Sequence, residues 1–453
     1  MVHRRFDNEK VVDVSILGEA ITFPNKKCIA KNRFMKSAMS EKLAVFKPGD
    51  KTNGMPTENL INLYEKFGAG GFGMIVTGNV PVDQDHAEGI GNMLIDERLD
   101  TLERRLMFSR LANAGKKEGS RMIVQLGHAG NMTPVHINST PLSSTSVAAH
   151  PSNKPWKIFG KPIQIKKCDM KEKIIDKYVY AANFCYDCGF DGVEIHAAYG
   201  FFLASFLSEK LNGRRDEYGG SIANRSRIIF DIYKAIREAI PIDSSFLIGI
   251  KICAVDFKNA HSNLIDIGKL MTMIDAAPFD FIELSGGEFE KPPLKNSEII
   301  TCVKGAFYDK TISSIQKQLK KSILYLSGGF RTSYGMVTAV QEQFTQGISI
   351  GKPAAAEPDL PYKILEKRVF SCAKYDYFNY ALTENGALSQ MYQLSRKSLK
   401  DSKQHILEGV MDLSNPTTAR KFFDAYALFV QGLIVSFKQN KPINDLFEWT
   451  STR

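Results

Sequence analysis

Eight short apolar runs alternate with longer segments of helical pattern, and this alternation constrains the fold of the 453-residue chain more than any other feature. Each run is too short for a globular helix, and most are flanked by Gly, Asp or Ser, as strands are. In one intervening stretch, Ile228, Ile229, Ile232 and Ile236 recur at helical spacing and predict one buried stripe. The runs cover residues 32–39, 73–77, 122–126, 192–196, 246–252, 279–284, 323–326 and 347–350.

Strands that alternate with helices predict a parallel α/β fold, and eight of them suit a (β/α)8 (TIM) barrel. An open doubly wound sheet alternates in the same way, so the pattern alone does not separate the two. No GxGxxG sequence follows the first strand, which weakens the dinucleotide-binding version of the open sheet. We therefore expect the barrel.

The two ends of the chain lie outside this repeat. Residues 12–14 and 20–23, with Gly18 between them, predict a small hairpin that closes the N-terminal end of the barrel. Beyond about Glu366 the pattern becomes helical and rich in aromatic residues. We expect the barrel to cover residues 1–370, with a C-terminal helical extension, residues 371–453, packed on it.

Composition excludes several classes of protein. The chain is 43% hydrophobic and its longest apolar run, residues 425–437, is too short to span a bilayer. The 59 Lys and Arg against 49 Asp and Glu give a charge of +10, which suits phosphorylated ligands or simply a solvated basic surface. No nucleic-acid-binding motif surrounds the basic residues. The first ten residues have no apolar signal core, so we expect a cytoplasmic protein without a membrane or nucleic-acid partner.

The seven cysteines are scattered, which argues against a disulfide scaffold. Cys185 and Cys188 form a single CxxC within a helical pattern. Because a second pair is missing, we expect two reduced cysteines on one helix face and no metal site.

Polar residues gather where the strands end, which is where barrels place their chemistry. Lys251 interrupts an otherwise apolar strand, and a charge in that position needs a partner. That partner is either a ligand or a barrel carboxylate, Glu194 or Glu283. His196 ends the fourth strand, with Tyr199 three residues on. The pair either donates hydrogen bonds to a developing oxyanion or has a structural role.

Two glycine-basic motifs end the seventh and eighth strands. The first comprises Gly328, Gly329, Phe330 and Arg331, and the second is Gly351 with Lys352. Glycine lets the backbone approach a ligand closely, and successive N–H groups bind phosphate. A lone Gly-Gly is usually a turn, but a phosphate site after strands seven and eight recurs in barrels. We expect phosphate binding here.

Three motifs resemble the Old Yellow Enzyme family. Residues 32–40 (NRFMKSAMS) are similar to its opening strand, and residues 125–130 (QLGHAG) to its third-strand motif. The most specific match is GFDGVEIHAAYG at residues 189–200, which continues to NGRRDEYGGSIANR at residues 212–225. The resemblance spans about residues 10–370.

This resemblance implies a barrel that binds FMN non-covalently, with NADH or NADPH as reductant and a small-molecule substrate. Ser37, Ala38 and Met39 would present backbone to the flavin ring, and Ser40 would hydrogen-bond a flavin carbonyl. Asn79 and Gln125 would hold the pyrimidine edge, and Lys251 would stabilise the anionic reduced flavin. The two glycine-basic motifs would bind the ribityl phosphate, while His196 and Tyr199 would bind the substrate carbonyl.

The chain also departs from the family. Many relatives have Arg at the positions of Lys251 and Lys352, and Asn131 replaces another usual Arg. Tyr199 stands where His or Asn is usual, and Phe201 replaces the Tyr that donates a proton. The flavin side matches the family, and the substrate side is altered.

We expect hydride transfer from NAD(P)H through FMN to an electron-poor alkene, such as an enone, or to a quinone. One alternative is an FMN enzyme that oxidises an amine-like substrate. Larger relatives of that kind carry an iron–sulfur cluster, for which this chain has no cysteine cluster. The other alternative is a flavin-binding protein with impaired catalysis.

Overall fold

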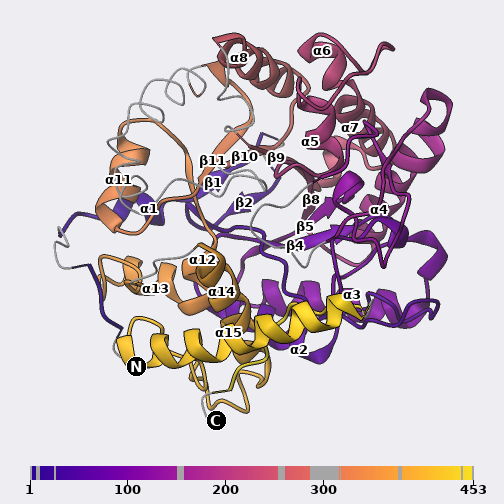
Figure 1. Ribbon diagram of the computed structural model, residues 1–453. Coiled ribbons are helices and arrows are strands. Elements are labelled where there is room, and N and C mark those ends of the chain that lie inside the picture. Colours follow the sequence, from indigo (N-terminus) through magenta and orange to yellow (C-terminus); the bar gives the residue numbers. More distant parts are fainter. Residues whose placement is uncertain are drawn as a thin grey trace.

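In the computed structural model, eight parallel strands close into a barrel in the order β10-β11-β12-β3-β4-β5-β8-β9 (Figure 1). This confirms the (β/α)8 prediction and excludes the open sheet. The structure describes residues 3–6, 11–24, 27–149, 158–253, 261–285, 316, 318–375, 380–439 and 442–450. The barrel strands are β3 (Phe34–Lys36), β4 (Met74–Pro81), β5 (Arg121–Gly127), β8 (Gly192–Ala197), β9 (Leu247–Cys253), β10 (Phe281–Ser285), β11 (Ile323–Ser327) and β12 (Gly347–Ile350).

The helices bury the stripes that their sequences predict. In α7 (Arg227–Ala239), Ile228, Ile229, Ile232 and Ile236 are completely buried against the barrel core. Gly189, which follows α4 (Asp176–Asp187) closely, has a φ of +81°, a left-handed value that suits a helix end. The helices around the barrel are α2 (Glu58–Ala69), α3 (Leu102–Lys116), α4 (Asp176–Asp187), α5 (Phe202–Leu207), α6 (Ile222–Arg225), α7 (Arg227–Ala239), α8 (His261–Ala276), α11 (Ser333–Gln341), α12 (Lys352–Ala356) and α13 (Leu360–Leu365).

An N-terminal hairpin is present, but it begins later in the chain than predicted. Its strands are β1 (Ile21–Thr22) and β2 (Ile29–Ala30), paired antiparallel. Residues 12–14 are not a strand, because the Asp13 carboxylate accepts hydrogen bonds from the backbone and hydroxyl of Ser15 and turns the chain into α1 (Ser15–Gly18). A second short pair, β6 (Leu142–Ser143) and β7 (Ile163–Gln164), lies outside the barrel.

The hairpin closes the barrel end opposite the strand carboxyl ends. Phe23 is completely buried, with its ring centroid 6.2 Å from that of Phe281. Its apolar cluster includes Met74, Leu247 and Phe281, each the first residue of its strand.

The C-terminal extension contains α14 (Tyr380–Ser395) and α15 (Pro416–Lys438). Helix α14 packs against α2 and α12, and its buried side chains join the barrel core cluster. The boundary near residue 370 stays a prediction, because the two parts share one core.

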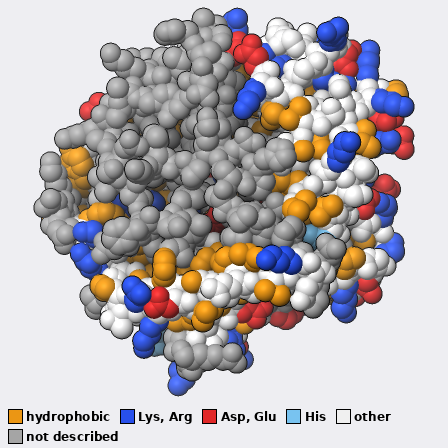
Figure 2. Space-filling model, in the orientation of Figure 1, with side chains coloured by type: hydrophobic (Ala, Val, Ile, Leu, Met, Phe, Trp, Pro, Cys, Tyr) orange, Lys and Arg blue, Asp and Glu red, His pale blue; other side chains and the backbone are white. Residues whose placement is uncertain are grey.

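Helix α15 contains the apolar run at residues 425–437. Three of its apolar residues are exposed, namely Phe423, Leu428 and Val435, and Figure 2 shows hydrophobic side chains along this helix. Within the described ranges, no helix combines the length and the apolar character needed to cross a membrane.

Candidate active site

A cavity of about 310 Å³ opens where the barrel strands end. Its lining contains nine of the fifteen residues that the sequence predicts for the site. These are Ala38, Met39, Ser40, Asn79, Gln125, His196, Tyr199, Lys251 and Lys352.

Strand register explains why they meet. Asn79 on β4 is the register partner of Gln125 on β5, and His196 on β8 is the partner of Lys251 on β9. Residues distant in sequence therefore share one end of the barrel.

The partner of Lys251, which the sequence analysis left open, is the barrel carboxylate Glu283. Its Nζ lies 3.0 Å from Glu283 Oε2 and donates to Ser37 Oγ at 3.0 Å. Glu283 is completely buried and also accepts hydrogen bonds from Ser37 (2.6 Å) and Ser349 (2.7 Å). Burial disfavours the ammonium, yet Glu283 and Glu194 raise the pKa of Lys251, so it stays charged. Lys251 also lines the cavity, so the ion pair and a ligand-binding role are compatible.

Glu194 supports Gln125. The Gln125 side-chain amide donates to Glu194 Oε1 at 2.7 Å, deep in the barrel. Burial, followed by the nearby charge of Glu283, raises the pKa of Glu194 well above its usual range. Glu194 therefore fixes the direction of the Gln125 amide, which lines the cavity.

His196 is a neutral imidazole. Burial and the Lys251 charge lower its pKa to about 3. The edge of Phe201 packs against its ring, with centroids 5.1 Å apart and planes at 76°. Tyr199 has a φ of +64°, which is uncommon for a bulky residue and is a feature of functional sites.

Glu88 is a site residue that the sequence analysis missed. It lines the cavity, contacts the Ser40 hydroxyl, and accepts hydrogen bonds from Asn79 Nδ2 and Asn92 Nδ2, each at 3.1 Å. It lies in a polar segment beyond β4, where its sequence context carries no distinguishing signal.

The two predicted phosphate motifs lie beside one another. Of their residues, Lys352 lines the cavity and the others do not. Ser327 at the end of β11 is the register partner of Ser349 on β12, so the turns that follow are neighbours. Gly328 and Gly329 have φ values of +109° and +79°, which side chains rarely adopt. Phe330 is buried and anchors the first turn to the core.

These features fit a bound flavin. Asn79 Oδ1 and His196 Nδ1 are buried and have no hydrogen-bond partner among the described residues, although both side chains line the cavity. Buried polar atoms of this kind normally have a partner, which a ligand supplies. The left-handed glycines and Lys352 suit a phosphate, and Gln125 and Lys251 offer donors to a polar ring edge.

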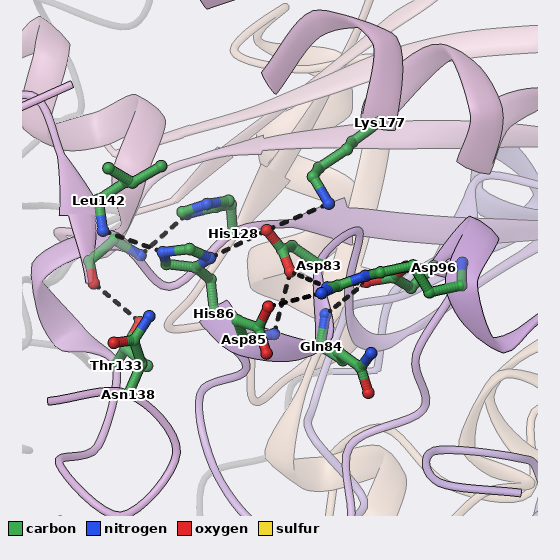
Figure 3. A network of polar contacts seen from close by, with 12 residues as sticks. Asp83, Gln84, Asp85, His86, Asp96, His128, Thr133, Asn138, Leu142 and Lys177 are labelled. Carbon is green, nitrogen blue, oxygen red and sulfur yellow. Dashed lines mark hydrogen bonds and ion pairs between the residues drawn. The ribbon is translucent and has the colours of Figure 1, made fainter. Parts of the chain in front are cut away.

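A second polar cluster lies beyond the ends of β4 and β5 (Figure 3). Asp83 accepts a hydrogen bond from His86 Nδ1 at 3.0 Å and pairs with Lys177 at 3.3 Å and Arg98 at 2.7 Å. His86 Nε2 accepts from the Leu142 backbone N–H at 2.9 Å, which places the imidazole proton on Nδ1.

Asp83, His86 and His128 are close enough together to suggest a metal site. However, cations already occupy both Asp83 oxygens, and the two imidazoles are stacked with centroids 4.1 Å apart. Stacked rings direct their lone pairs along parallel planes, which does not suit one shared ion. We interpret the cluster as support for the 128–132 loop, through which Met132 reaches the cavity.

Comparisons with known proteins identify the family of this chain. Residues 19–370 match the model of the "NADH:flavin oxidoreductase / NADH oxidase family". The NADH-dependent flavin oxidoreductase nadA of Aspergillus parasiticus is 35% identical over 394 residues, which cover 86% of this chain and 87% of that protein. The NADH-dependent flavin oxidoreductase iliE of Hypocrea jecorina is 31% identical over 74% of this chain and 85% of that protein.

A similar solved structure is the Old Yellow Enzyme homologue from Zymomonas mobilis. The structural match covers 79% of this chain and 94% of the Zymomonas mobilis chain, with a TM-score of 0.64 and 21% sequence identity. The fold, the site and the family match define a flavin oxidoreductase built on a (β/α)8 barrel. The chain belongs to the NADH:flavin oxidoreductase / NADH oxidase family, the Old Yellow Enzyme family.

Proposed function

We propose that this protein uses FMN to pass hydride from NADH to an electron-poor alkene, such as an enone, or to a quinone. The observation that carries the proposal is the cavity, which unites a neutral His196 and Tyr199 with Gln125 and Lys251. When bound, the flavin supplies the hydride chemistry. NADH is our choice of reductant because the fungal relatives nadA and iliE are NADH-dependent.

His196 and Tyr199 act on the substrate oxygen. A neutral imidazole and a phenol each offer one N–H or O–H donor, and together they polarise a carbonyl as negative charge develops on its oxygen. Because the His196 pKa is about 3, its protonation state does not change between pH 5 and 9. Phe201 lines the same cavity and has no proton to donate.

The flavin is held by residues of four kinds in this proposal. Gln125, Asn79 and Ser40 bind the polar ring edge, and Ser37, Ala38 and Met39 contribute backbone. Lys251 provides the charge beside the ring. The phosphate is bound by Gly328, Gly329, Phe330, Arg331, Gly351 and Lys352.

Two measurements test this function. The purified protein should be yellow and should release FMN on denaturation, and it should oxidise NADH faster when 2-cyclohexenone or a quinone is added. Colourless protein that takes up no FMN on reconstitution would refute the cofactor.

His196→Ala tests the substrate side separately. Loss of one oxyanion donor typically costs about 10²–10³ in rate, so enone turnover should fall by that factor while FMN stays bound. Full enone turnover by His196→Ala would place the substrate elsewhere.

A further inference from the structure

The C-terminal extension supplies one wall of the active-site cavity. Residues of α14 line it together with the barrel residues, and we call this set the α14 face: Glu384, Asn385, Ala387, Leu388 and Met391. Their three- and four-residue spacing places them on one side of the helix. The family model ends at residue 370, so this wall lies beyond the matched segment.

The C-terminal part of the α14 face is apolar. Ala387, Leu388 and Met391 are all buried, and they belong to the same apolar cluster as the barrel core, against which Met39 packs. Met132, Phe159 and Phe201 also line the cavity. A ligand group between these walls therefore meets hydrocarbon from the barrel and from the extension.

Helix α14 is anchored to the barrel. The completely buried Lys66 of α2 donates to the Leu394 carbonyl at 2.7 Å, and Asn62 donates to the Ser395 carbonyl at 3.1 Å. Helix α14 is also bound to the C-terminal segment of the chain, because Gln393 Nε2 donates to the Trp449 carbonyl at 2.9 Å.

A second contact ties the extension to the cavity itself. Asp445 forms an ion pair with Lys42, and both residues line the cavity. The hydrogen bonds at the C-terminal end of α14, together with that from the Ser389 hydroxyl to the Phe447 carbonyl at 2.7 Å, hold the helix on either side of Met391.

We propose that the α14 face determines substrate specificity, with Leu388 and Met391 limiting the size of the apolar substituent that a ring-shaped substrate carries. This rests on the proposed function, since it concerns the substrate of the same cavity. The substrate class is then a compact cyclic enone or quinone. A bulky apolar group on the ring would have to displace Leu388, and a packed, anchored helix resists that displacement.

Ligand binding by the FMN-loaded protein tests the proposal without turnover. A phenol oxygen can accept hydrogen bonds from the two donors in the cavity, His196 and Tyr199, so the affinities of phenol and 4-phenylphenol compare the space around one oxygen. Their Kd values are measured from the change in flavin absorbance, in the wild type, Leu388→Ala and Leu388→Trp. Leu428→Ala is the matched control, because Leu428 lies on the exposed side of α15 in the same extension.

We expect Leu388→Ala to tighten 4-phenylphenol relative to phenol by about tenfold, since small changes in an apolar pocket alter discrimination by factors of this order. Leu388→Trp should shift the ratio by a similar factor in the opposite direction. Leu428→Ala should leave both Kd values unchanged.

Three results would count against the inference in different ways. Unchanged Kd ratios in both Leu388 variants, with FMN bound, would refute the role of the α14 face in specificity. The proposed function would not be affected. A weakened FMN Kd with unchanged phenol ratios would show that the α14 face contacts the cofactor instead. If neither phenol nor 2-cyclohexenone perturbs the flavin of the wild type, the proposed function fails, and this inference fails with it.

Discussion

At the scale of single residues, the Lys251–Glu283 pair places an ammonium group in the cavity lining with its partner carboxylate behind it. Lys251→Met should weaken FMN binding and lower the flavin reduction potential, because the variant no longer stabilises negative charge on the reduced ring. Charge-assisted hydrogen bonds contribute about 1.5–3 kcal/mol, so the loss of affinity should be tenfold or more. Potentiometry and FMN titration measure the two effects.

Glu283→Gln is the matched control for that variant. It keeps the ammonium, the cavity lining and the side-chain shape, but removes the carboxylate that partly neutralises Lys251. The potential should therefore shift upward, opposite to the shift in Lys251→Met. An unchanged potential in Lys251→Met, with FMN fully bound, would mean that Lys251 serves only the barrel.

Phe201 lines the cavity and has no proton to donate. Alkene reduction adds a hydride to one carbon and a proton to the other, and Phe201 cannot provide the proton. Phe201→Tyr should therefore speed the reduction of weakly activated enones. Quinone turnover should change little, because reduced quinone oxygens take protons readily from water.

The Phe201→Tyr experiment compares steady-state rates for one enone and one quinone in the variant and the wild type. Enone turnover that does not improve, together with equally poor quinone turnover, would show that the missing donor is not the limiting defect. The natural reaction would then lie outside enone reduction.

At the scale of elements, the hairpin that closes the barrel stabilises the fold and lies at the end opposite the active-site cavity. Phe23→Ala removes a completely buried aromatic ring and should destabilise the protein by about 3–5 kcal/mol. Thermal unfolding should show a lower midpoint, while FMN affinity of the folded protein stays unchanged. Ile29→Ala, at a half-exposed position of the same hairpin, is the control and should have a small effect. Equal effects of the two substitutions would mean that the hairpin does not close the barrel.

Elements differ in how well their sequence determines them. The barrel strands were predictable because each is an apolar run that ends in polar residues, and their C-terminal ends brought Gln125, His196 and Lys251 into one cavity. The prediction of a first hairpin strand at residues 12–14 was wrong. The apolar pattern there gives no sign of the local turn in which Asp13 accepts a hydrogen bond from Ser15.

The contribution of α14 to the cavity was not predictable from its own sequence. Leu388 and Met391 have the spacing of any buried helix face, and only the packing of α14 on α2 and α12 directs them toward the site. Glu88 was missed for a related reason, since its role depends on contacts with Ser40 and Asn79 that no local pattern encodes.

At the scale of the whole molecule, two buried lysines link stability to pH. Lys36 donates to the Val76 carbonyl at 2.9 Å and Lys66 to the Leu394 carbonyl at 2.7 Å, and neither side chain reaches solvent. Burial lowers the pKa of Lys36 to about 8 and that of Lys66 to about 8. Lys36 of β3 lies against α2, with its Nζ 4.9 Å from the centroid of the Phe67 ring, while Lys66 joins α2 to the extension.

The sign of the effect follows from proton binding. Between the folded pKa near 8 and the ordinary value of 10.5, the unfolded chain holds protons that the folded chain has released. Stability therefore rises with pH over that window, whereas the penalty for burying the charged ammonium is present in full below pH 8. From pH 7 to pH 9 each lysine should add about 1 kcal/mol to the free energy of unfolding.

We predict that the thermal midpoint of the wild type rises by a few degrees between pH 7 and pH 9, and that Lys36→Met and Lys66→Met each reduce this rise. Lys438→Met, at an exposed position at the end of α15, should leave it intact. Buried cysteines such as Cys28, whose pKa burial raises from 9.0 to about 11, act in the opposite direction as the pH approaches and passes 9. Because they are common to all the variants, they cancel when the slopes are compared. Identical slopes in the wild type and both lysine variants would mean that the two ammonium groups keep their ordinary proton affinity, and that their carbonyl contacts offset the cost of burial.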